Sequence, residues 1–300
     1  MLEKNQGIFS LYLTDENDNE RFVLSTENMV VDNGLDMICS RNGEDLLRKC
    51  VVSSDNTEVQ PKTNSIPMQV ATSGNIVSTS AGINDKDPHY FWSRTVFLFE
   101  PGQATGNLSK IGITAEDGSI FSVTLFKDSN GKLITIQPRS NERLRVIYEY
   151  RVFIDKSDVV YENVVLDDKS DTTYKITIRP AFIYDKWFAD RIRYALFIDK
   201  RGLSYEDYLR GYNDVISSVD SGPADYIGQA GSINTVPYRL STFIKSYTGE
   251  ISWEKFNDSR GIAAIVFHTS RGAYQIGFEP RLKKTDQQKI NFTISLEQGR

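Results

Sequence analysis

The sequence predicts a mainly β protein made of two antiparallel β-sandwich-like domains with one or two short helices. The clearest reason lies in residues 143–154, where apolar and charged residues alternate with a period of two. That period is typical of a strand with one buried face. Further short apolar runs are separated by turn residues such as Asn130-Gly131, the strongest short hairpin signal. Aromatic residues make up 11% of the chain, and this share favours sheet over helix.

Length and charge limit the class of protein. A chain of 300 residues exceeds the usual size of a single core, so we expect domains at 1–156 and 157–300, divided at the polar break 155–158. With 39% hydrophobic and 25% charged residues, the composition is that of an ordinary folded protein. The net charge of −5 and the lack of a Lys/Arg block argue against nucleic-acid binding. No apolar run predicts a membrane span, and residues 1–5 do not resemble a secretory signal, so we expect folding in a cytoplasm.

The first half of the chain predicts mostly strands. A helix or helical turn is expected over 28–38, where apolar residues approach helical spacing. The polar segment 53–83 predicts an extended arm lying over a neighbour or a mobile surface loop, because it is long and interrupted by Pro61 and Pro67. Strands are expected at 7–13, 21–24, 49–52, 91–100, 107–114, 120–126, 133–137 and 143–154.

The second half predicts one hairpin, one helix and several strands. The hairpin comprises 159–166 and 173–183. The helix is expected over 204–219, because Ser204 resembles an N-cap and an apolar stripe follows it. Residues 221–232 are rich in Gly and Ala and predict an irregular segment. The remaining strands are expected at 191–198, 239–247, 251–255, 263–268, 274–278 and 290–296.

No motif for catalysis or cofactor binding is present. The only histidines, His89 and His268, each stand among aromatic or apolar residues, and no G-x-S-x-G or glycine-rich phosphate loop occurs. We expect packing or surface roles for both. Cys39 and Cys50 are too few for a disulfide framework or a closed zinc site, and predict small buried side chains. The sequence therefore predicts no enzyme, no cofactor and no metal.

The three tryptophans are the candidate contact residues. Trp92, Trp187 and Trp253 fall among predicted strands or at their ends. Exposed aromatic rings at such places can stack on sugars or anchor a protein partner, whereas buried rings only fill a core. Both interpretations remain open from the sequence.

Several segments, in order along the chain, resemble a family of tailed-bacteriophage virion proteins described as tail-fibre or structural constituents. The resemblance rests on VDNGLD (31–36), YFWSR (90–94), GNLSKIGI (106–113), LFKD (125–128), the strand 144–152, YKITIRPA (174–181), AYQIGFEP (273–280) and the closing strand 284–295 with Gly299-Arg300. Two positions depart from the family pattern. Glu279-Pro280-Arg281 stands where a double proline is more usual, and Glu297-Gln298 where a tryptophan is common.

The resemblance implies a β-rich, non-enzymatic part of a phage tail, baseplate or fibre. It implies a location in the virion, after assembly in the host cytoplasm, and contacts with other virion subunits in a homo-oligomer. The alternative is a carbohydrate-binding receptor module of a tail fibre, in which the tryptophans contact a glycan of the host surface.

Overall fold

A computed structural model shows the chain as a mainly β protein, which confirms the predicted fold class. The structure describes residues 2–40, 46–166, 172–183, 208–212, 216–218, 221–224, 226–252, 255, 257, 260–269 and 272–300. No helix in these ranges is long and apolar enough to cross a membrane. The first half contains β1 (Leu2–Thr14), β2 (Glu20–Val30), α1 (Asp32–Ser40), β3 (Lys49–Ser53), β4 (Gln69–Ser73), β5 (Ile76–Asn84), β6 (Tyr90–Phe99), β7 (Lys110–Thr114), β8 (Ile120–Leu125) and β9 (Arg143–Ile154). The second half contains β10 (Val159–Val165), β11 (Thr173–Ala181), β12 (Tyr208–Tyr212), β13 (Tyr226–Thr235), β14 (Ile244–Ile251), β15 (Ile262–Thr269), β16 (Gly272–Leu282) and β17 (Ile290–Gly299).

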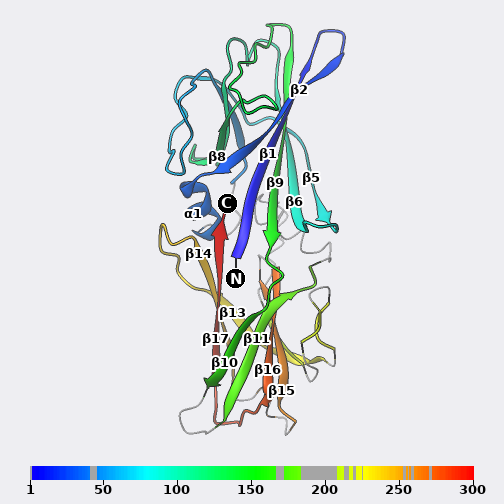
Figure 1. Ribbon diagram of the computed structural model, residues 1–300, viewed down its shortest axis with the longest axis vertical. Helices are drawn as coiled ribbons and strands as arrows, with labels where there is room; N and C mark the ends of the chain where they lie inside the picture. Colours follow the sequence, from blue (N-terminus) through cyan, green and yellow to red (C-terminus); the bar gives the residue numbers. More distant parts are fainter. Residues whose placement is uncertain are drawn as a thin grey trace.

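The first nine strands form two sheets that share β2. One sheet has the order β5–β6–β9–β1–β2, and the other has the order β4–β3–β7–β8–β2. All these pairings are antiparallel, and Figure 1 shows the long central strands β1, β9 and β6 side by side. The alternation in β9 has the expected effect: Val146, Tyr148 and Tyr150 are buried against Phe9 and Leu11 of β1 in the core.

The helix α1 lies where helical spacing predicted it, although β2 continues to Val30 and delays its start. Its apolar side is buried, including Leu35 and Ile38. Gly34 is required at its contact with β8, because a Cβ there would lie 2.1 Å from the carbonyl oxygen of Phe121. The helix thus packs directly on the backbone of the sheet.

The last eight strands form a second antiparallel array. Their order is β10–β11–β16–β15–β12–β13–β14–β17. One face of β11, β15 and β16 packs against β14 and β17 in a second core, which contains Tyr247, Phe267, Tyr274 and Leu296. The predicted hairpin of β10 and β11 and the predicted final strand are confirmed.

Three predictions about elements are wrong. Within the helix predicted over 204–219, residues 208–212 form β12 instead, because β13 and β15 on either side hydrogen-bond to that backbone. The irregular segment 221–232 contains the start of β13. The loop predicted over 53–83 contains β4 and β5. The Ser and Thr residues of β5 are tolerated because no residue of that strand is buried, whereas the buried Ser73 of β4 donates to the carbonyl oxygen of Leu98 at 2.6 Å.

Smaller predictions fail as well, and the strand predicted at 239–247 begins only at Ile244. Residues 133–137 make isolated bridges, at Leu133 and Ile136, and no continuous strand. Of 251–255, only Ile251 belongs to a strand, and residues 253–254 lie outside the described ranges. The strand predicted at 191–198 lies outside them as well.

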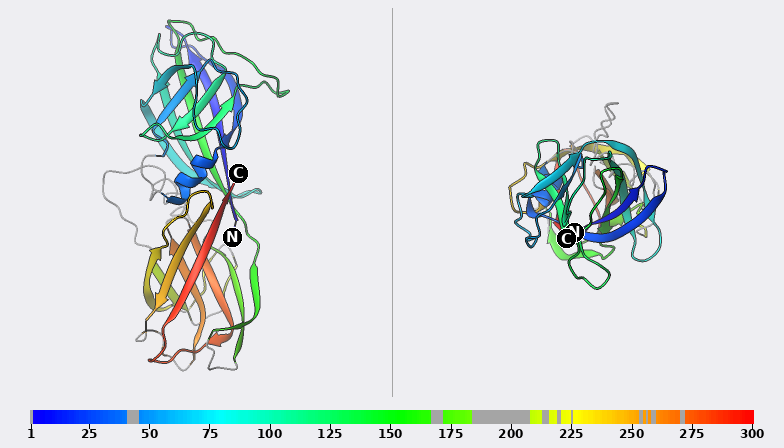
Figure 2. Two further views of the ribbon diagram at one scale, coloured as in Figure 1. Left: turned by 90° about the vertical axis from the view of Figure 1, so that its left-hand side faces the viewer. Right: turned by 90° about the horizontal axis from the view of Figure 1, so that it is seen from above.

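The two arrays stack end to end into an elongated molecule, with both termini at its waist (Figures 1 and 2). Among the described strands, β1 and β17 make the one pairing between the arrays, a short parallel one that aligns Glu3 with Gln298. The last strand of the first array thus ends at Ile154 and the first strand of the second array begins at Val159, on either side of the predicted boundary. The division into domains 1–156 and 157–300 stays a prediction.

Candidate functional site

Trp92 lies on the outer face of β6. The strand alternates as a two-sided strand should: Phe91 and Ser93 are buried, whereas the outward Arg94 is exposed and Trp92 is partly exposed. Gly82 of β5 lies opposite Trp92, and a Cβ there would be 2.5 Å from the indole ring. A glycine at this position therefore lets the indole lie directly against the neighbouring strand.

Two arginines stack on aromatic rings beside this tryptophan. The guanidinium of Arg94 lies 4.6 Å from the centroid of Trp92, and that of Arg151 lies 4.6 Å from the centroid of Tyr90. Both distances are within the range of a cation–π interaction. The pairing of β6 with β9 brings these side chains together, because Trp92 is opposite Arg151 and Arg94 is opposite Glu149.

Glu149 holds both arginines in place. Its carboxylate accepts a hydrogen bond from Arg94 through one oxygen and from Arg151 through the other, the latter at 2.6 Å. The side chain of Glu149 is only 10% exposed, whereas that of Arg94 is 49% exposed. The ring centroid of Phe153 lies 5.1 Å from that of Tyr90. We call Tyr90, Trp92, Arg94, Glu149, Arg151 and Phe153 the aromatic–arginine patch.

A similar stack continues along the same face. Arg145 lies 4.4 Å from the ring centroid of Tyr12, and two of its nitrogens donate to Glu20 at 2.6 and 2.5 Å. Phe22 packs edge-on against Tyr12 and is 58% exposed. The outer face thus presents flat rings with oriented guanidinium groups. Such a face can stack on and hydrogen-bond to a ligand.

The other predicted residues are placed only in part. Trp187 and Trp253 lie outside the described residues. His89 is buried and edge-on to Phe91, and His268 is buried and stacked on Phe182, in agreement with packing roles. Cys39 and Cys50 are buried, as predicted. Burial raises the pKa of the Cys50 thiol.

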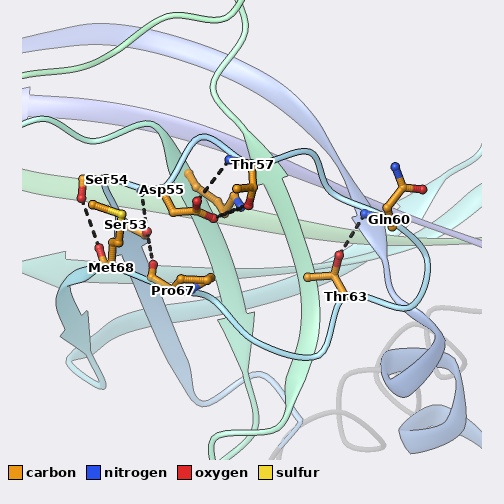
Figure 3. A network of polar contacts seen from close by, with 9 residues as sticks. Ser53, Ser54, Asp55, Thr57, Gln60, Thr63, Pro67 and Met68 are labelled. Carbon is orange, nitrogen blue, oxygen red and sulfur yellow. Dashed lines mark hydrogen bonds and ion pairs between the residues drawn. The ribbon is translucent and has the colours of Figure 1, made fainter.

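A second polar feature, missed from the sequence, pins the segment 54–68 to the sheet. Asp55 and Lys110 form an ion pair with side chains 5% and 2% exposed, and Thr57 also contacts both. Figure 3 shows the segment folded over the strands, with Ser53 donating to the carbonyl oxygen of Pro67 at 2.5 Å. Burial by itself would raise the pKa of Asp55, but hydrogen bonds from Lys110 and Thr57 outweigh it and hold that pKa below its usual value.

The described residues contain no group of three or more His, Cys, Asp or Glu side chains that would hold a metal ion. One open cavity of about 420 Å³ lies over β11 and β16. Its charged lining residues are Lys175, Glu279 and Arg281, and Lys175 forms an ion pair with Glu162 at 3.5 Å. The lining is of mixed charge and selects no single kind of ligand.

Sequence reasoning found Trp92 but not its partners. The alternation in β9 had placed Arg151 and Glu149 on one face, yet only the pairing with β6 brings them to Tyr90 and Trp92. No family model, curated protein or solved structure matches this chain.

Proposed function

We propose that this protein is a structural subunit of a tailed-phage virion, in the tail, baseplate or fibre, and acts through protein–protein contacts. The observation that carries the structural role is the end-to-end stack of two β arrays joined at the waist by both chain termini. The virion location comes from the family resemblance. A stack of this kind suits a spacer that carries contact surfaces at a fixed separation.

The aromatic–arginine patch supports a role in binding a protein partner. Trp, Tyr and Arg are the residues most enriched among those that dominate the energy of protein interfaces. In the patch, Glu149 already orients Arg94 and Arg151, so little side-chain freedom is lost on binding. The patch lies on a sheet face, where a flat partner surface can reach it.

Composition of purified particles tests the location. We expect mass spectrometry of purified virions to detect the chain in a fixed copy number, and imaging to place it in the tail apparatus. Its absence from mature particles would contradict the proposal.

Incorporation of variants tests the patch. We expect the double variant Trp92→Ala/Arg94→Ala to fold and yet to enter particles poorly, because the partner loses both its stacking and its hydrogen-bonding groups. Lys132→Ala, at an exposed turn, serves as the matched surface control. Equal incorporation of both variants would rule out the patch as the contact.

Glycan binding is a second candidate, favoured by the position of Trp92 on an outer face. An indole on a surface can stack on a sugar ring. In that case Trp92→Ala would abolish binding to a glycan array or to host cells while leaving incorporation into particles unchanged. The two measurements therefore separate the structural from the receptor role.

A further inference from the structure

The strand β10 is an exposed apolar edge. Its side chains include Val160, Tyr161 and Val165, which are 44%, 53% and 54% exposed, and Leu166 just beyond it is 40% exposed. Among the described strands, β10 pairs with β11 alone. A long apolar edge of this kind is a template for pairing with another strand, and proteins usually shield it with charges or prolines.

A bulge divides β10 into two halves. Tyr161 pairs with Ile176 and Val164 with Tyr174, so Glu162 and Asn163 together lie opposite Lys175. Asn163 has a φ of 56°, a left-handed conformation that asparagine tolerates well. The extra residue reverses the alternation beyond it.

The bulge decides which side chains share a face. Val160 and Val165 are opposite Thr177 and Thr173, on the outer face of β11. Val159, Tyr161 and Val164 are opposite Ile178, Ile176 and Tyr174, which point toward the second core. From either end of the segment 159–166 toward the bulge, the side chains therefore alternate between the inner and the outer face in the same way.

We propose that β10 pairs antiparallel with β10 of a second copy of this chain, about a two-fold axis between Glu162 and Asn163. This register aligns Val159 with Leu166, Val160 with Val165, Tyr161 with Val164 and Glu162 with Asn163 of the other copy. The first three of these pairs are apolar, and each joins side chains on one face of the sheet. The central pair places a carboxylate beside an amide, which is a hydrogen-bond donor.

Self-complementarity identifies the occupant as a second copy. Shifting the register by one residue pairs an outward side chain with an inward one, because cross-strand partners share a face. A shift of two residues in one direction places the charged Asp158 opposite Val165. A shift of two residues in the other direction moves Val160 past Leu166, so that Val160 has no apolar partner. The sequence and the bulge thus fit one register best, and that register needs no other partner. The role of this contact rests on the proposed function, since it supplies the symmetric interface that a homo-oligomeric subunit requires.

Sedimentation of the purified full chain tests the pairing. We expect a mass of twice the 34.1 kDa of one chain, and a mass of one chain for Val160→Lys, because the lysine is placed between apolar side chains of the other copy. The matched control is Val77→Lys, since Val77 is a 50% exposed valine on the edge strand β5. A monomeric wild type, or a dimer broken by Val77→Lys and not by Val160→Lys, would overturn the proposal.

Cysteine cross-linking tests the register. Val160→Cys and Val165→Cys, mixed and treated with oxidised glutathione, are expected to form a disulfide-linked dimer, because opposed residues have Cβ atoms about 5 Å apart. Neither variant alone is expected to form this disulfide. In a dimer of one variant, the two identical cysteines lie roughly five residues apart along the paired strands, at about 3.3 Å for each residue. Equal cross-linking in all samples would refute this register. Both experiments use the purified chain alone. The purified chain can therefore be monomeric although the protein is found in virions, and it can be dimeric although the protein is absent from them.

Discussion

At the scale of single residues, Asp55 and Lys110 form a buried ion pair in the first array. Two ionised groups taken out of water cost several kcal/mol each unless they meet a well-placed partner. Here each is the other's partner, and Thr57 donates to Asp55 at 2.7 Å through its hydroxyl. The pair fixes the start of the segment 54–68 on β7.

Removing one partner of this pair is expected to be costly. Lys110→Met leaves Asp55 buried without its cation, and we expect a loss of about 3 to 5 kcal/mol in the free energy of unfolding. The double variant Asp55→Asn/Lys110→Met is expected to recover part of this loss, because no unpaired charge stays buried. Denaturant unfolding measures both. A single variant as stable as the wild type would contradict the role of the pair.

The same pair predicts a dependence on pH. The pKa of Asp55 is lower in the folded than in the unfolded chain, so its contribution is fully present above the usual carboxyl pKa of about 3.9. That contribution is lost as the pH falls through the folded-state pKa. We expect the stability difference between wild type and Asp55→Asn to shrink on acidification below about pH 4. A difference that is constant with pH would disprove this assignment.

Single residues were predictable where the local pattern decides their environment. The alternation of β9 placed its inward residues from Leu144 to Val152 correctly in the core, and Cys39 and Cys50 were expected to be buried. It did not indicate that Glu149, on the other face, would be buried as well. Lys110 was not expected to be buried, because the sequence gives no sign that Asp55, far away along the chain, would cover it. The partners of Trp92 in the patch also lie far away along the chain, so the sequence indicated Trp92 alone as a contact residue.

At the scale of elements, strands buried on one face were predicted well and context-dependent elements were not. The apolar spacing in 204–219 matches a helix, but residues 208–212 lie between two strands whose ladders they complete. Tertiary pairing overrides local spacing in such a case. The strand β5 was missed for the opposite reason, since its exposed Ser and Thr residues carry almost no hydrophobic signal.

The helix α1 is joined to the second array through its Asp36. This carboxylate accepts hydrogen bonds from the hydroxyl of Tyr238 and from the backbone N–H of Ser241, the latter at 2.7 Å. Tyr238 in turn accepts a hydrogen bond from the N–H of Phe243 at 3.1 Å. Burial, together with the nearby carboxylate, raises the pKa of Tyr238 to about 12.

Replacing Tyr238 with Phe is expected to weaken this contact. The variant leaves Asp36 and the N–H of Phe243 without the hydroxyl, and we expect a loss of about 1 to 3 kcal/mol at neutral pH. Because the tyrosine pKa is raised by folding, the hydroxyl's contribution is present below about pH 10 and is lost as the pH rises toward about 12. Denaturant unfolding at pH 7 and at alkaline pH checks both. A variant that differs from the wild type only at high pH would contradict this account.

At the scale of the whole molecule, a buried polar network joins the two arrays. Glu3 accepts hydrogen bonds from Tyr274 at 2.8 Å and from Gln298 at 2.7 Å. Asn5 donates to the carbonyl oxygen of Gly299 at 2.9 Å and accepts from Tyr150. Tyr150 belongs to the first core and Tyr274 to the second, so the network connects the two cores through the terminal strands.

Loss of Asn5 is expected to uncouple the arrays. In Asn5→Ala, the buried hydroxyl of Tyr150 and the partly buried carbonyl oxygen of Gly299 each lose their hydrogen bond to the amide, at about 1 to 3 kcal/mol for each bond lost. A junction weakened by this amount no longer forces the two arrays to unfold together. We therefore expect calorimetry to show one transition for the wild type and two for Asn5→Ala. Asn17→Ala, at the exposed β1–β2 turn, is the matched control and should keep one transition. Two transitions already present in the wild type would mean that the terminal strands do not make the stack a single rigid unit, and the spacer role would lose its basis.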